Sequence, residues 1–460
     1  MGYIHFFDDW QLMSYQNLQR KMGKPKYIPE ATLEDSLTEG TWNFPLVTRL
    51  PENGKYVGLY GAACDIPAGS KHVSGFKPRT QVLCYAESND GINWVKPDLR
   101  DKAAFDGHVY ATNQVFGLEK IIDGGPVYFD SYDPDPSRRF KYLINITPGL
   151  HMAGQRGLVT SQDGIHWELS NVFNHLPATD TPSSVFYNPE AGVYVLNSRF
   201  VGGDRRVFFR ETKDWKNFTE PYLVMHPDPE DPPLVGIYGM PVVRYENIFV
   251  GLLWLIYCDP GTNALPNGVI ECYLSYSYDG RNFNRAFHKP FIAKNELGEH
   301  GGGCIYTSSM LIDENNTIRF YSGGSKAEHF QNQTLTDAAL MLHTMRLDGF
   351  VYFSTHSGKG SLITRPFFIT GDDLRINVRT PWGGVRARIL DEKGKSLPGF
   401  GYEDCASMTG DQLFWTPRWK GGTFGSAKSS KRRQLEIEIV TGEIYGIRGD
   451  FEIPKSLWNT

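Results

Sequence analysis

The chain of 460 residues has only six cysteines, and no two of them form a C-x-x-C pair. Scattered thiols are not typical of a zinc site or of a disulfide-stabilised extracellular domain, so a reducing cytoplasm is the expected compartment. The longest apolar run, 248–258, is interrupted by Gly251 and is too short to cross a bilayer. The first residues lack the cationic and apolar segments of a signal peptide. A membrane is therefore not an expected partner.

The chain also lacks an excess of positive charge. Its net charge is −5 and its pI is about 6.2, which provides no basic field for a polyanion and makes nucleic acid an unexpected partner. Aromatic residues are abundant at 13%, together with 48 glycines and 28 prolines. This composition is typical of short aromatic strands joined by tight turns. It also suits the binding of sugars, whose C–H faces pack on aromatic rings.

A strand-turn-strand phrase recurs along the first three quarters of the chain. Each copy has a Ser or Thr, an Asp two residues later and an aromatic residue that opens the next strand, and the copies lie at 85–94, 158–167, 209–218 and 274–283. Asp-Gly favours a tight hairpin because glycine accepts a positive φ. The turn aspartates Asp90, Asp163, Asp214 and Asp279 are 73, 51 and 65 residues apart, which is the length of a four-stranded unit with long loops.

The spacing predicts an all-β fold, a five-bladed β-propeller over 1–355. A divergent fifth turn at 347–350 lies 69 residues after Asp279 and keeps the period. The second strand of each blade is expected at 56–60, 142–146, 193–199, 249–257 and 318–321. A β-sandwich with coincidental hairpins is the alternative. The best helical segments are 10–20 and, more weakly, 334–342.

A different pattern begins after residue 355. Segments such as 374–380, 384–391 and 434–440 alternate strictly between apolar and polar residues and are separated by glycine, proline and Asp-Lys-Gly turns. Alternation of this kind indicates antiparallel strands with one solvated face. We therefore expect a small C-terminal antiparallel β-sandwich over 356–460.

The hairpin phrase and the order of the two domains resemble glycoside hydrolase families 32 and 43, whose propeller blades carry Ser-x-Asp-Gly-x-x-Trp hairpins. The opening phrase Phe7-Asp8-Asp9-Trp10 is similar to that of uncharacterised bacterial proteins of predicted glycosidase function. The invertase signature Trp-x-Asn-Asp-Pro-Asn-Gly is absent, so fructan cleavage is not expected. The resemblance implies a carbohydrate substrate and an active site at the hub, where the first strands converge.

A glycosidase needs two carboxyl groups at that hub, one to protonate the leaving oxygen and one to attack or to activate water. Asp180, at the start of a first strand, is the expected base or nucleophile, and a turn-capping role is the alternative. Glu271 lies among apolar neighbours that would favour a protonated acid. Glu299 and His300 precede three glycines and are further candidates for the proton donor. A solvated face remains the alternative for Glu271.

Other polar and aromatic residues are expected to bind the substrate. They are Glu39, Trp42, Asn113, Arg199, Arg206, Tyr238 and His329. The arginines belong to a group with Arg205 and Arg210 that suits an anionic group such as a uronate or sulfate, and surface charge on a hairpin is the favoured alternative. Buried structural pairing is the alternative for Glu39, Trp42 and Asn113.

The residues together predict a glycoside hydrolase acting on an oligosaccharide or a polysaccharide-derived substrate, with no cofactor and no metal. Two other classes remain open. One is a noncatalytic sugar-binding propeller, and the other is a glycoside phosphorylase, which would need an Arg/His cluster for phosphate. The sequence does not determine the sugar, the stereochemistry of cleavage or the oligomeric state.

Overall fold

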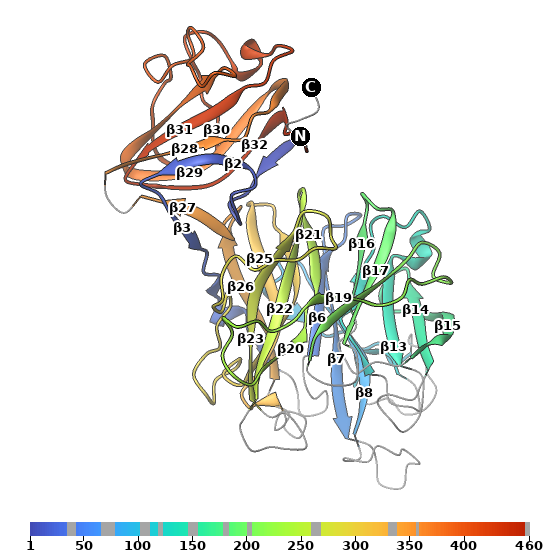
Figure 1. The fold of residues 1–460 in the computed structure, drawn as a ribbon. Helices are drawn as coiled ribbons and strands as arrows, with labels where there is room; N and C mark the ends of the chain where they lie inside the picture. The colour runs from blue at the N-terminus through green and yellow to red at the C-terminus, as the bar shows by residue number, and fades with distance from the viewer. Residues whose placement is uncertain are drawn as a thin grey trace. The chain divides into compact units, whose positions relative to one another are not determined.

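A computed structural model describes residues 1–34, 43–65, 79–101, 111–117, 123–145, 155–177, 184–199, 205–258, 268–329, 338–355 and 358–455. Apart from the helical position His329, the elements of this part of the chain are β-strands and short turns, as expected for an all-β fold (Figure 1). Three short 3-10 turns interrupt the strands: η1 (Pro29–Ala31), η2 (Pro136–Arg138) and η3 (Phe424–Ala427). None of the described helical segments is long and apolar enough to cross a membrane.

The chain divides into two compact units. The terminal unit comprises Met1–Lys24, Glu314–Thr317 and Met345–Thr460, and the modular unit comprises Pro25–Asp313 and Ile318–Thr344. These bounds differ from the expected division into 1–355 and 356–460, because residues 1–24 and 345–355 group with the terminal unit. The first strands of the chain pair with strands of the terminal unit, so they are not part of the modular unit.

The described strands of the modular unit form five successive antiparallel modules. Module 1 contains β6 (Asn43–Arg49), β7 (Tyr56–Asp65), β8 (Arg79–Ser88), β9 (Trp94–Val95) and β10 (Gln114–Phe116). Module 2 contains β11 (Asp123–Gly124), β12 (Tyr128–Phe129), β13 (Phe140–Asn145), β14 (Gln155–Ser161) and β15 (Trp167–Pro177). Module 3 contains β16 (Ser184–Asn188), β17 (Val193–Arg199), β18 (Val207–Thr212) and β19 (Tyr222–Met225).

Modules 4 and 5 share one sheet through a single parallel pair, Ile270 with Cys304. Module 4 contains β20 (Val235–Gly239), β21 (Val242–Tyr245), β22 (Ile248–Cys258) and β23 (Gly268–Ser277). Module 5 contains β24 (Cys304–Ile312), β25 (Thr317–Ser325) and β26 (Ala338–Arg346), and its outer strand comes from the N-terminal β4 (Lys26–Tyr27) and β5 (Leu33–Glu34). The five second strands predicted from the sequence correspond to β7, β13, β17, β22 and β25, so these predictions are confirmed.

The recurring phrase forms the same turn four times. In module 1, Gly91 N donates to Ser88 Oγ at 2.9 Å, and the backbone N–H groups of Ile92 and Asn93 both donate to Asp90 Oδ1 at 2.8 Å. Equivalent bonds form around Asp163, Asp214 and Asp279. The phrase builds its hairpin because each aspartate satisfies backbone donors that the sharp turn leaves without a ladder partner.

These hydrogen bonds also act on the carboxyl groups. The backbone N–H groups of Asn217 and Lys216 hold the pKa of Asp214 well below its ordinary value. For Asp90, burial favours the neutral acid, but the bonds from Asn93 and Ile92 outweigh it and the pKa is again lowered. Hydrogen bonds that favour the charged form lower a carboxyl pKa. The turns are therefore built around ionised aspartates.

The turn glycines of modules 2 and 4 pack on the module that precedes each of them in the chain, and the turn glycine of module 1 packs on module 5. A Cβ on Gly91 would lie 2.5 Å from Tyr321 Oη, and one on Gly280 would lie 2.7 Å from Asn188 Nδ2. In the third copy the glycine is replaced by Trp215, which keeps a positive φ of 58° and buries its ring among residues of modules 2 and 3. The turns thus fasten neighbouring modules together.

We expect Gly91→Ala to lower the free energy of unfolding by about 2–4 kcal/mol, because it adds a clash to an unfavourable φ of 72°. The matched control is Gly192→Ala, where φ is 64° and no atom lies within 4 Å of the added Cβ. The control should lose only about 1 kcal/mol. Urea unfolding of both variants measures the difference, and equal losses would show that the close packing of the turn is unimportant.

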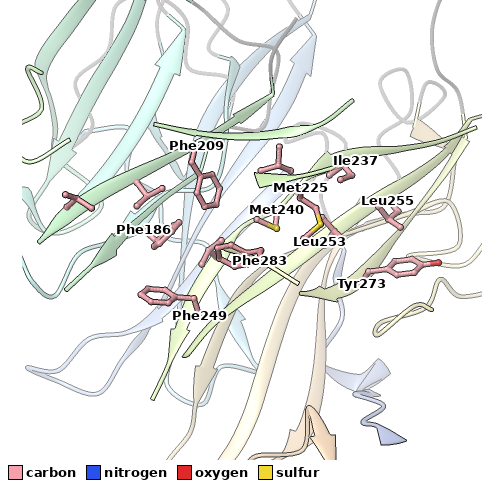
Figure 2. Packing of buried hydrophobic residues seen from close by; sticks show 14 residues of the cluster. Phe186, Phe209, Met225, Ile237, Met240, Phe249, Leu253, Leu255, Tyr273 and Phe283 are labelled. Atoms are coloured by element: carbon pink, nitrogen blue, oxygen red, sulfur yellow. The ribbon is translucent and has the colours of Figure 1, made fainter. Parts of the chain in front are cut away.

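Apolar clusters join the modules in a closed sequence. One cluster joins modules 1 and 2, another joins modules 2 and 3, and a third joins modules 3 and 4. Figure 2 shows the third cluster, in which Phe186 of module 3 packs next to Phe249 of module 4 with ring centroids 5.6 Å apart. Trp254 Nε1 of module 4 donates to Thr307 O of module 5 at 2.8 Å. Each module therefore contacts the next.

The sequence of contacts closes between modules 5 and 1. Ser309 Oγ of β24 donates to Val47 O of β6 at 2.7 Å and accepts from Val47 N at 2.9 Å. Ser308 Oγ donates to Pro45 O at 2.7 Å, and a shared apolar cluster includes residues of β7, β8, β25 and β26. Because β4 and β5 complete module 5, an early segment of the chain also closes the last module.

The terminal unit is one hydrogen-bonded sheet of antiparallel strands. Its strands are β1 (Gly2–Ile4), β2 (Leu12–Gln16), β3 (Gln19–Met22), β27 (Val351–Ser354), β28 (Lys359–Thr364), β29 (Phe368–Leu390), β30 (Met408–Trp415), β31 (Gln434–Val440) and β32 (Glu443–Glu452). The antiparallel strands expected after residue 355 are present. They form a single sheet because the long strand β29 pairs with β32 through its first half and with β31 through its second half.

Two local predictions were wrong. Residues 10–20, the best helical segment by periodicity, form β2 and part of β3, because strands β28 and β27 supply their backbone partners. The weaker helical segment 334–342 falls partly outside the described residues, and its residues 338–342 belong to β26.

The turn predicted at 347–350 does not repeat the hairpin phrase. Its Asp348 is buried at a positive φ and receives two hydrogen bonds from Arg448 Nη2.

Candidate functional site

Aromatic side chains from modules 1, 4 and 5 meet near the start of β6, the end of β20 and the start of β24. The ring centroids of Phe44 and Trp254 are 5.1 Å apart and stacked, and Tyr306 meets both rings edge-on. Tyr238 lies 5.7 Å from Tyr306 and 4.6 Å from His329. We call these five residues the hub cluster. They come from modules 1, 4 and 5, and Phe44 of module 1 precedes Tyr238, the next of them along the chain, by 194 residues.

The hub cluster combines apolar rings with a few fixed polar atoms. Tyr306 Oη and His329 Nδ1 lie 3.2 Å apart, and Trp254 Nε1 is held by Thr307 O. All five side chains are buried, with His329 and Tyr238 each 7% exposed. Rings with a small number of oriented polar groups are typical of small-molecule sites. Tyr238 and His329, both predicted to bind substrate, are thus brought together.

Arg205 extends the hub cluster from module 3. Its guanidinium carbon lies 5.4 Å from the Tyr238 ring centroid, and Ile237 N donates to its carbonyl oxygen at 3.1 Å. Gly236 makes this approach possible, because a Cβ there would lie 3.2 Å from Arg205 Cβ. Arg205 Nη1 is buried without a hydrogen-bond partner in the described part of the chain. An unsatisfied buried donor is costly and marks a functional candidate.

Glu328 directly precedes His329 in the chain and was not among the residues predicted from the sequence. The half-buried residue lies in a segment that packs on Gly303, where a Cβ would lie 1.9 Å from Ala327 O. Burial raises the pKa of the Cys304 thiol to about 12, and the charge of Glu328 adds to that rise. Its position next to His329, a residue expected to bind substrate, was the signal in the sequence.

Several predicted residues cannot be placed in this arrangement. Glu39, Trp42 and Asp180 lie outside the described residues, as does the side chain of Arg199. Arg206 follows Arg205 directly and is half-buried. The roles assigned to these residues stay predictions.

Glu271 faces away from the hub cluster. It pairs with Leu255 across the ladder, whereas Trp254 pairs with Cys272. Successive side chains of a strand point to opposite faces, so Glu271 shares the face of Leu255 and Tyr273, which is the face packed against module 3. Its Oε1 accepts a bond from Lys294 N at 3.1 Å.

Three other predicted residues have separate surroundings. Glu299 is exposed, and His300 Nδ1 lies 3.6 Å from Glu34 Oε1. Asn113 is fully buried and donates both amide hydrogens within the protein, to Tyr60 Oη and to Tyr85 O. The structure therefore shows Asn113 in a pairing role. A role for its buried Oδ1 in sugar binding stays a prediction.

Two further polar groups resemble sites but are already neutralised. Asp228, Asp231 and His288 have ligand atoms within 4.8 Å of one another, but Arg285 forms ion pairs with both aspartates at 2.5 and 2.7 Å. A cation thus already balances these carboxylates.

A shallow groove of about 420 Å³ between modules 3 and 4 is lined by Glu211, Thr219, Tyr222, Leu223, Arg281 and Asn282. Its floor is the two-bond ion pair between Arg281 and Glu211.

Comparison with known proteins finds solved structures of similar shape. A glycosyl hydrolase from Bacteroides ovatus is 14% identical with a TM-score of 0.45, covering 71% of this chain and 94% of its own. A β-1,2-mannobiose phosphorylase from Listeria innocua is 11% identical with a TM-score of 0.47, covering 73% and 98%. An N-acetylgalactosamine deacetylase from F. plautii is 15% identical with a TM-score of 0.46, covering 72% and 95%.

No family model and no curated protein matches the chain. Similarity to the solved structures at this level does not distinguish among their activities.

Proposed function

We propose that the modular unit is a five-bladed β-propeller and that the protein is a glycoside hydrolase acting at its hub. Five antiparallel modules that contact one another in order, with the fifth returning to the first, support the propeller. The terminal unit is then an accessory β domain.

The hub cluster carries the functional proposal. These rings, each at most 8% exposed, would form the wall of a sugar site, and the imidazole, phenol and guanidinium groups beside them would supply hydrogen bonds to hydroxyls. Glu328 stands beside this cluster, and Asp180 begins the segment leading into β16. We assign Asp180 as base or nucleophile and Glu328 as general acid. Glu299 and His300 remain alternative acids to be tested by single substitutions, whereas Glu271 faces away from the hub cluster.

The test is product analysis with a panel of aryl glycosides and oligosaccharides, each incubated with and without phosphate. Hydrolysis that is independent of phosphate is the expected result. Release only in the presence of phosphate would show a phosphorylase, a second candidate that the unpaired Arg205 Nη1 favours. Binding without release would show a noncatalytic sugar-binding protein.

Arg205→Ala is expected to raise KM by about tenfold or more while changing kcat less, because a charge-assisted hydrogen bond to substrate contributes about 1.5–3 kcal/mol. Arg205→Lys keeps the charge but not the fork of donors, so it should recover part of the affinity. Initial rates over a range of substrate concentrations separate the two parameters. An unchanged KM in Arg205→Ala would remove this residue from the binding site.

A further inference from the structure

The terminal unit holds one tryptophan in solvent on a rigid bulge. In β29, Thr380 pairs with Gly410 and Val385 pairs with Met408, so residues 381–384 lie opposite Thr409 alone. The bulge has the sequence Pro381-Trp382-Gly383-Gly384. Bulges re-aim side chains and occur at functional positions. This one turns Trp382 outward, leaving it 86% exposed.

Several contacts make the bulge rigid. Thr409 Oγ1 donates to Gly383 O and Thr380 Oγ1 donates to Val440 O, both at 2.8 Å. Only glycine fits at position 383, because a Cβ there would lie 1.9 Å from Val440 O. The backbone that carries the indole is therefore held in place. A ligand that stacks on the ring loses little binding free energy to the ordering of the protein backbone.

The surroundings of Trp382 favour a sugar over a protein partner. Thr409 lies opposite the bulge, and Gly410 pairs with Thr380 at its start. A Cβ on Gly410 would meet open space. Val440, an apolar neighbour, is small and 36% exposed. A protein-binding anchor is normally surrounded by further apolar residues that exclude water. A ring beside hydroxyl groups and open glycines instead suits the C–H face and hydroxyls of a saccharide.

A second exposed tryptophan shows the contrast. Trp10 is 46% exposed, but the Arg365 guanidinium lies 4.0 Å from its ring centroid and already covers one face. Trp382 makes no ring or cation contact with any residue in the described part of the chain. Leaving so large an apolar surface in water sacrifices the stabilisation that burial provides.

We propose that Trp382 is the platform of an accessory glycan-binding site, on which one ring of a neutral polysaccharide stacks. The site lies in the terminal unit and requires no residue of the hub cluster. It would hold the protein on a polymer while any chemistry proceeds elsewhere, and it remains testable if the hub cluster has another function.

The experiment is affinity electrophoresis of the whole chain in gels that contain soluble xylan, mannan, arabinan or glucan. Wild type should be retarded by at least one of them, and Trp382→Ala should weaken that binding by about tenfold or more, which corresponds to about 1.4 kcal/mol. Trp10→Ala is the matched control and should migrate as wild type does. Trp382→Phe should retain part of the binding and Trp382→Leu should not, because stacking needs a ring face.

Three results would overturn the proposal. They are the absence of retardation by every polysaccharide, full retention by Trp382→Leu, and a change of sedimentation from dimer to monomer in Trp382→Ala, which would identify a contact between copies instead. Turnover of a small aryl glycoside, measured in parallel, should be equal in wild type and Trp382→Ala. If wild type binds a polysaccharide but does not turn over the aryl glycoside, the function proposed for the hub cluster is contradicted and the Trp382 site is not.

Discussion

Lys141→Met is expected to lower the free energy of unfolding by about 3–5 kcal/mol, because it leaves the buried carboxylate of Asp130 without its cation and leaves Asp133 with Arg138 alone. Lys141 Nζ lies 2.8 Å from both Asp130 Oδ2 and Asp133 Oδ2, and the three side chains are at most 2% exposed. Lys141 also donates to Arg138 O at 2.7 Å. Methionine fills the same volume but removes the charge and all of these bonds.

The network connects modules 2 and 3. Tyr194 Oη of β17 donates to Asp130 Oδ2 at 2.7 Å, so Asp130 receives bonds from both modules. For Asp133, burial alone would raise the pKa, but the bonds from Lys141 and neighbouring groups hold it below its ordinary value. Removing Lys141 takes one of the two cations from Asp133, which keeps Arg138 at 3.0 Å, and takes from Asp130 the cation at 2.8 Å.

Urea unfolding, followed by tryptophan fluorescence, measures the loss. The matched control is Lys55→Met, because Lys55 is 44% exposed and pairs with Glu87 at 3.2 Å on the surface. Exposed pairs contribute about 0–1 kcal/mol. Adding Asp130→Asn and Asp133→Asn to Lys141→Met should restore part of the stability. Equal effects of Lys141→Met and Lys55→Met would contradict a buried network.

The second large effect is expected on catalysis. Asp180→Asn and Glu328→Gln should each reduce kcat by about 10²–10⁴-fold, the usual contribution of a positioned acid or base. Both substitutions preserve shape, so the midpoint of urea unfolding should stay close to that of wild type. The two variants test the residues assigned under the proposed mechanism.

Substrates with different leaving groups separate the two roles. An activated aryl leaving group needs little protonation, so Glu328→Gln should lose less activity on such a substrate than on an oligosaccharide, whereas Asp180→Asn should lose activity on both. Glu296→Gln is the control, since Glu296 is exposed and lies on a neighbouring turn. Full activity in Glu328→Gln would remove it from the mechanism, and Glu299 and His300 would become the acids to test.

The hairpins could be predicted because their causes are local. The Ser, Asp and Gly of each phrase bond to one another within four residues, so the sequence alone specifies the turn and the strands that flank it. The strand predicted at 193–199 has the same bounds as β17. Residues 10–20 were misread because their pairing partners, in β27 and β28, lie more than 300 residues away.

The site depends on tertiary contacts to a greater extent. Tyr238 and His329 were chosen separately, and no spacing in the sequence indicates that their rings lie 4.6 Å apart. Glu271 has apolar neighbours in sequence, yet strand alternation turns it to the face opposite Trp254. Glu328 was overlooked because its position beside β24 arises from the packing of its segment on Gly303.

The sequence by itself determined the strands, the turns and their repetition, because these depend on hydrogen bonds and alternation among residues close in the chain. Only the tertiary structure decided which strands close module 5, which faces meet at the hub and where the first residues pair. Those outcomes depend on contacts between segments far apart in sequence, whose free energy appears only when the modules pack against one another.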